Sequence, residues 1–166
     1  MSELAHAAAE AEQLAASGSQ SELATLRARW DDELEAAARN SDFRERAVAY
    51  RAIGQFRYRQ KLELLRRGLE DESPAARGSA LLSLELLSRD GPAPVNADRS
   101  LLHTLATSDP NAVVRRLAIL CLKNGSPQRD TIVILDGMAD DDEQPRELRD
   151  AAKRVAAALT KKSRAR

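Results

Sequence analysis

Apolar residues recur at three- and four-residue spacing along most of the chain. Leu23, Leu26, Trp30 and Leu34 form one such stripe, and comparable stripes follow in later segments. This spacing is typical of amphipathic helices packed on one face. Clusters of Asn, Asp, Ser, Gly and Pro interrupt the stripes and predict turns between the helices. Expected helices cover residues 1–16, 22–39 after an N-cap at Ser21, 43–56, 58–69, 74–88, 98–108, 112–123, 131–139 and 145–159.

One stretch also fits a strand. Ile132 to Leu135 is a short run of branched apolar residues, as in a buried strand. No other segment offers a strand to pair with it, and its neighbours are helical in pattern. Helix is therefore the preferred interpretation, and the chain is expected to be all-α. The abundance of Ala, Leu, Arg and Glu and the low aromatic content agree with this.

The turn-and-helix units repeat. Arginines recur at intervals of about 35 residues, and each has an alanine three residues later. The pairs are Arg44 and Ala47, Arg77 and Ala80, Arg115 and Ala118, and Arg149 and Ala152. Six residues before these arginines stand Ala38, Asp71, Asp109 and Glu143. A period of this size with two helices per unit is typical of α-solenoids.

The repeat resembles the HEAT repeat, particularly the short bacterial HEAT-like units that also occur in phycobilisome lyase proteins. The third unit carries the full family pattern as Asp109, Pro110, Val114, Arg115 and Ala118. The resemblance covers about residues 21–159 and implies an α-solenoid of about four helical hairpins, preceded by an extra helix. It also implies a hydrogen-bonded ladder between repeats. The implied ladder residues are Arg44, Asp71, Arg77, Asp109, Arg115, Glu143 and Arg149.

Three regions follow from this pattern. Residues 1–20 form an amino-terminal helix and linker, residues 21–160 form the repeat array, and residues 161–166 form a basic tail that we expect to be disordered. The first helix either caps the array or stays mobile. Residues 89–97, with one glycine and two prolines, are expected to be a loop.

The sequence holds little catalytic chemistry. Cys121 is the only cysteine and His6 and His103 are the only histidines, so a zinc cluster of Cys and His is not expected. The acidic pairs and runs lack the spacing of a calcium loop, and no glycine-rich phosphate loop is present. We therefore expect no enzymatic activity, metal or cofactor. Without an apolar run of about 20 residues, the expectation is a soluble cytoplasmic protein.

Charge is segregated along the chain. Acids outnumber bases by six in residues 1–42, and bases outnumber acids by six in residues 43–67. The two segments either neutralise each other or leave a binding face. Residues of the basic segment that would form such a face, with Arg44 engaged in the ladder, are Arg46, Tyr50, Arg51, Phe56, Arg57, Arg59, Arg66 and Arg67.

Three functions are consistent with this chain. The first is a non-catalytic adaptor that presents a helical surface to a protein partner with an acidic surface, since arginine and aromatic residues are enriched at interface hot spots. The second is nucleic-acid binding through residues 43–67. The third, a lyase accessory or chaperone, follows only from the family resemblance.

Overall fold

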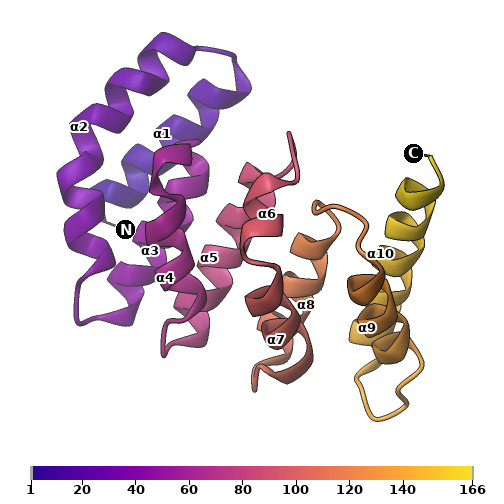
Figure 1. Cartoon of the computed structure of the whole chain (residues 1–166). Helices are drawn as coiled ribbons and strands as arrows, with labels where there is room; N and C mark the ends of the chain where they lie inside the picture. The colour runs from indigo at the N-terminus through magenta and orange to yellow at the C-terminus, as the bar shows by residue number, and fades with distance from the viewer. Residues whose placement is uncertain (1, 166) are drawn as a thin grey trace. The chain divides into compact units, whose positions relative to one another are not determined.

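The computed structural model describes residues 2–165, and all regular secondary structure in that range is helical (Figure 1). The prediction of an all-α chain is therefore confirmed. The helices are α1 (Glu3–Ala16), α2 (Gln20–Ala38), α3 (Phe43–Gln55), the 3₁₀ helix η1 (Arg59–Lys61), α4 (Leu62–Leu69), α5 (Pro74–Leu87), α6 (Ala93–Ala97), α7 (Arg99–Ser108), α8 (Ala112–Leu122), α9 (Arg129–Ala139) and α10 (Arg146–Arg164). The chain divides into two compact units, with the boundary in the sequence between Leu87 and Ser88.

In the first unit, α3 lies at the centre. It contacts α1, α2, α4 and α5, and α5 also packs on α4. Helices α3 and α5 pack closely at Gly54, whose N–H donates to Ser83 Oγ at 2.9 Å. A Cβ on Gly54 would lie 2.8 Å from the Cα of Ser83, so only glycine allows this approach. Ser83 is fully buried and in turn donates to the Tyr50 carbonyl oxygen at 2.6 Å.

The amino-terminal helix packs on this unit. Ser2 caps α1 by accepting a hydrogen bond from the Ala5 N–H. Leu4, Ala8 and Ala11 are buried, and α1 contacts both α2 and α3. Of the two alternatives for this helix, packing is the one that the structure adopts.

The second unit contains two helical hairpins, α7–α8 and α9–α10, with α6 packed on α7. Its core includes Leu102, Ile119, Leu122 and Leu159, all fully buried. Ile132 to Leu135 lies in α9, which confirms the helical interpretation. Leu135 is fully buried while Val133 is 60% exposed, as one face of a helix requires.

Three local expectations were wrong. Residues 89–97 are not all loop, because α6 forms at their end and buries Val95 completely. The basic tail is helical as far as Arg164, because α10 continues to that residue. Lys162 Nζ also donates to the Lys123 carbonyl oxygen at 2.7 Å. The second helix begins at Gln20 after Ser19, two residues earlier than a cap at Ser21 would place it.

A larger side chain at Ala118 tests how closely the helices of the second unit pack against one another. This residue of α8 is fully buried. Replacing it with Leu adds three carbons to a filled space and should lower the free energy of unfolding by about 1–3 kcal/mol, measured by urea denaturation. The control is Ala112→Leu on the same helix, where the residue is exposed. Equal stability of the two variants would contradict close packing at Ala118.

Candidate functional site

The turns before α3, α5 and α8 share one hydrogen-bonding pattern. The side chain of the first turn residue accepts a hydrogen bond from the backbone N–H two residues later. An arginine six residues after that first residue donates back to its carbonyl oxygen. This pattern joins Asn40 with Asp42 and Arg46, Asp71 with Ser73 and Arg77, and Asp109 with Asn111 and Arg115.

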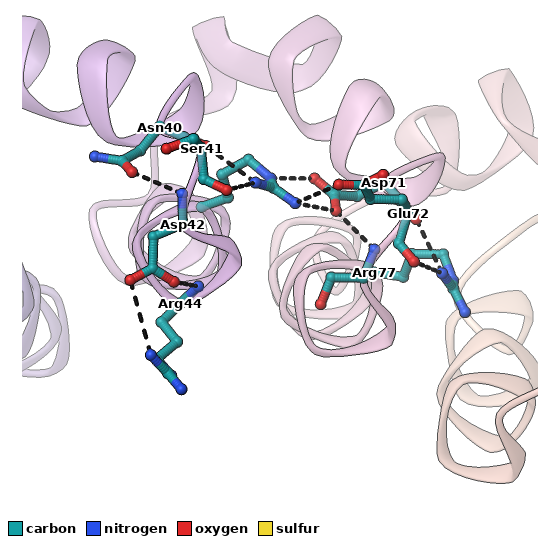
Figure 2. A network of polar contacts seen from close by, with 9 residues as sticks. Asn40, Ser41, Asp42, Arg44, Asp71, Glu72 and Arg77 are labelled. Atoms are coloured by element: carbon teal, nitrogen blue, oxygen red, sulfur yellow. Dashed lines mark hydrogen bonds and ion pairs between the residues drawn. The ribbon is translucent and has the colours of Figure 1, made fainter.

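The pattern corrects the predicted alignment of the first repeat. Arg46, and not Arg44, is equivalent to Arg77 and Arg115. The alanine three residues later is then Ala49, which is fully buried, whereas Ala47 is partly exposed. The side chain of Arg44 is 78% exposed, lies 3.9 Å from Asp42 and covers the ring of Phe43. Figure 2 shows Arg44 pointing away from Asp71, so Arg44 is not a ladder residue.

One ladder contact joins Arg46, on α3, to Asp71, in the turn before α5. The guanidinium donates through Nε to Asp71 Oδ2 at 2.8 Å and through Nη2 to Oδ1 at 3.0 Å. Its Nη1 donates to the carbonyl oxygens of Asn40 and Ser41, which lie across from Asp71 and Glu72 in Figure 2. The two paired side chains are only 12% and 7% exposed. The planar fork therefore binds a carboxylate and a turn at once, which lysine could not do in this geometry.

The ladder pair gives Asp71 a pH-dependent role in stability. Burial opposes the charged form, but hydrogen bonds from Arg46 and from the Ser73 N–H outweigh it and hold the pKa of Asp71 below its usual value. The unfolded chain then binds the proton more readily than the folded chain. The stabilisation is fully present above pH of about 4, the usual pKa range of Asp, and is lost as pH falls through the folded-state pKa.

Asp71→Asn should therefore reduce the loss of stability between about pH 4 and pH 2, because it removes one group whose pKa differs between the folded and unfolded chain. Thermal unfolding across that pH range measures this. Asp142→Asn is the control, since the Asp142 side chain is 99% exposed. An acid dependence that stays the same in Asp71→Asn would show that the Arg46 pair does not contribute to stability.

The fourth turn departs from the pattern. Asp141, and not Glu143, accepts the hydrogen bond from the backbone N–H two residues on, and Glu143 supplies that N–H. The Glu143 side chain is exposed, so the role expected of it is wrong. Arg149 instead lies 3.7 Å from Asp142. The Nε atoms of Arg115 and Arg149 are buried without a hydrogen-bond partner among residues 2–165.

The two aromatic residues predicted to anchor a partner lie in the core. Phe56 is fully buried and Tyr50 is 3% exposed. Tyr50 packs against Gly68, where a Cβ would come within 2.9 Å of the ring. Burial also raises the pKa of Tyr50. Neither ring is exposed enough to anchor a partner, and this part of the prediction was wrong.

Several of the arginines predicted to form a binding face instead contact other residues of this chain. Arg51 lies 3.7 Å from Glu12 of α1. Arg57, in the left-handed region at φ 54°, donates to the Gly54 carbonyl oxygen, and Arg59 donates to that of Leu87. Arg66 and Arg67, in the last turn of α4, are the exposed arginines of that helix.

Part of the acidic segment neutralises part of the basic one. Lys61 Nζ lies 2.8 Å from Asp31 and 2.6 Å from Glu35, and the Tyr58 hydroxyl donates to Asp31 at 2.8 Å. Although burial opposes the charged amine, these hydrogen bonds raise the pKa of Lys61. Lys61 was not among the residues that the sequence predicted for the binding face. The spacing of Asp31 and Glu35, four residues apart on one side of α2, is the signal that could have indicated a shared cation.

An open depression remains beside the ladder pair. It has a volume of about 570 Å³ and is lined by Arg39, Arg46, Tyr50, Arg67, Asp71 and Glu72, with Ala38 at its edge. Asp71 neutralises Arg46 there. Arg39, with a side chain 64% exposed and 3.5 Å from Glu35, and Arg67 add further positive charge at the rim. Glu72, with a side chain 91% exposed, also lines it, so three guanidinium groups face two carboxylates there.

The polar cluster around His103 connects two helices. His103 Nε2 lies 2.8 Å from the hydroxyl of buried Thr131, which also accepts from Arg99, so the cluster joins α7 to α9. Within residues 2–165, no group of three or more His, Cys, Asp or Glu residues could hold a metal ion. The same range contains no helix with the length and apolarity needed to cross a membrane.

Comparison with known proteins identifies the repeat. A family model described as HEAT repeats matches residues 32–123, more than half of the chain. No curated protein and no solved structure matches the chain. The matched range includes all three turns in which an Asn or Asp and an arginine share the hydrogen-bonding pattern described above. The helical hairpins agree with a HEAT-type solenoid. The chain therefore belongs to the HEAT-repeat family.

Proposed function

We propose that this protein is a non-catalytic scaffold that binds an acidic segment of a partner protein at the depression beside the Arg46–Asp71 pair. HEAT repeats generally serve as protein-interaction scaffolds, and such arrays offer extended helical surfaces. The observation that carries the proposal is the depression itself, with Arg39 and Arg67 at its rim.

The charge balance of the depression favours carboxylates as ligands. Arg46 is held in place by two hydrogen bonds to Asp71, so its position is fixed before a partner arrives. Arg39 and Arg67 are exposed and can reorient toward an incoming carboxylate. Guanidinium groups bind carboxylates through two parallel hydrogen bonds, which adds direction to charge attraction.

Nucleic-acid binding has less support. At least six of the eight bases in residues 43–67 contact carboxylates or carbonyl oxygens of this chain, namely Arg44, Arg46, Arg51, Arg57, Arg59 and Lys61. The charge left for phosphates is therefore smaller than the sequence suggests. A lyase accessory or chaperone role still rests on the family resemblance alone.

The test is quantitative capture of crosslinked partners with the wild-type chain and with Arg39→Glu/Arg67→Glu, followed by calorimetric titration of the partner identified. We expect the double variant to keep its helicity and to bind that partner at least tenfold more weakly. The matched control is Arg116→Glu/Arg146→Glu, two exposed arginines outside the depression.

Each outcome decides between the alternatives. Loss of the partner in the first variant and retention in the control supports the proposed surface. Full affinity in the first variant would place binding elsewhere. Binding of a DNA duplex that weakens steeply with salt and depends on Arg67 would instead favour the nucleic-acid function.

A further inference from the structure

Two grooves on this chain carry opposite charge. The acidic groove lies between α1 and α2, has a volume of about 360 Å³, and is lined by Glu3, Glu10, Leu26, Arg29 and Trp30 among others. The basic groove lies between α9 and α10, has a volume of about 520 Å³, and is lined by Asp136, Lys153, Ala156, Lys161 and Arg164 among others. Within residues 2–165, no third helix contributes a lining residue to either groove.

The charges that define the two grooves are not used inside the chain. Glu3, Glu10, Lys153, Lys161 and Arg164 are all exposed, and none forms an ion pair with another residue in the range 2–165. This differs from the depression in the first unit, where Asp71 already neutralises Arg46. Charges that are exposed and not neutralised within the fold are available to a second molecule.

Acidic residues extend along the α2 side of the acidic groove. Glu22 lies four residues before Leu26, and Glu33 lies four residues after Arg29, so both fall on the same side of the helix. Both are exposed. Glu3 and Glu10 line the groove together with Arg29, and Glu22 and Glu33 add two carboxylates along the same side of α2. On the basic groove, three cations accompany the single carboxylate of Asp136.

The grooves also match in their apolar surface. Leu26 and the partly exposed Trp30 lie in the acidic groove. The exposed Ala157 lies in the basic groove. Val133 is 60% exposed and lies three residues before Asp136, on the same side of α9. A cation from α10 placed over the indole of Trp30 would gain a cation–π interaction in addition to its ion pair.

Both grooves belong to helix pairs that are covered on other sides. In the first unit, α3 contacts both α1 and α2. In the second unit, α8 contacts α10 and α7 contacts α9. In repeat arrays, each hairpin buries a face against the next hairpin. A hairpin pair with one free, charged face is therefore the natural place for another hairpin to stack.

We propose that this protein self-associates head to tail, with the basic groove of one copy docked on the acidic groove of the next. The occupant of each groove is thus a second copy of the same chain. Because the two surfaces differ, the interface is heterologous, and repeated contacts form a ring or an open fibre. Self-association is separate from binding of an acidic partner, since Arg39 and Arg67 line neither groove.

The test is sedimentation velocity on the full chain over a concentration series reaching about 1 mM, the range in which weak, small interfaces associate. At low salt the average mass should rise above the 18.2 kDa of one chain, and it should fall back at about 0.5 M salt because screening weakens exposed charge pairs. A chain that stays monomeric over the whole series would overturn the proposal.

Charge reversal assigns the two surfaces. Glu3→Lys/Glu10→Lys and Lys153→Glu/Lys161→Glu should each raise the dissociation constant at least tenfold while keeping the circular dichroism of the wild type. An equimolar mixture of the two variants should associate again, because each then offers a surface complementary to the other. Arg146→Glu, an exposed control outside both grooves, should associate as the wild type does. Undiminished association of either double variant alone, or failure of the mixture, would overturn the assignment.

Discussion

Replacing Phe56 with Ala is expected to lower the free energy of unfolding by about 3–5 kcal/mol, the largest effect of any substitution considered. The ring is fully buried at the end of α3, and the backbone at this residue is fixed because its carbonyl oxygen accepts a hydrogen bond from Arg27 at 2.9 Å. Truncation leaves a cavity that the surrounding helices cannot close without moving. Urea denaturation of the full chain measures the loss.

Phe43→Ala is the matched control for Phe56→Ala. Phe43 begins α3 and is 41% exposed, so its truncation should change stability by only about 0.5 kcal/mol. The pair also distinguishes a core residue from a binding residue. A Phe56→Ala variant of normal stability that loses affinity for a partner would restore Phe56 to the role that the sequence suggested.

Gly54→Ala is expected to destabilise the protein by about 1–3 kcal/mol, although alanine is the better helix former. The added Cβ would lie 2.6 Å from Ser83 Oγ and 2.8 Å from the Cα of Ser83. Rotation of a side chain cannot relieve a contact with backbone, so α3 and α5 must separate. Separation also weakens the hydrogen bond from the Gly54 N–H to Ser83.

Gly137→Ala provides the opposite case. Gly137 lies within α9, and a Cβ there meets no atom within 4 Å. Without a steric cost, the helix propensity of alanine should raise stability by about 0.5–1 kcal/mol. Thermal unfolding of the two variants should therefore shift in opposite directions. A stabilised Gly54→Ala variant would show that the α3–α5 contact is looser than described.

Periodic features of the sequence were enough to predict the fold class. Apolar spacing and turn residues located nearly every helix, and the neighbours of Ile132 to Leu135 correctly favoured helix over strand. The short helix α6 was not predicted, because proline and glycine in residues 89–97 outweighed a five-residue helix. Its formation depends on Val95 being buried, which is a tertiary effect that local pattern does not report.

The alignment of the first repeat could not be fixed by spacing alone. Both Arg44 and Arg46 are followed three residues later by alanine. The distinguishing residue is Asn40, six before Arg46, whose side chain can form the same turn as Asp71 and Asp109. A pattern restricted to acidic residues does not include asparagine. The amide of asparagine supplies the same acceptor oxygen, which is the property that the turn requires.

The candidate site was harder to predict than the fold. Charge segregation in the sequence located the basic segment but did not show which cations are neutralised. Lys61 is engaged by two carboxylates of α2, and Arg46 by Asp71 from the next turn. These pairings depend on which helices are neighbours. Tyr50 and Phe56 were misassigned for the same reason, since their burial arises from packing across helices.

Arg46 holds the first two repeats together, whereas Arg44 is an exposed residue without that role. Thermal unfolding of Arg46→Ala and Arg44→Ala, measured side by side, tests this difference most directly. We expect a clearly lower midpoint for Arg46→Ala, because Asp71 and the carbonyl oxygens of Asn40 and Ser41 lose their shared donor. The midpoint of Arg44→Ala should be unchanged. A lowered midpoint for Arg44→Ala together with an unchanged one for Arg46→Ala would contradict the claim.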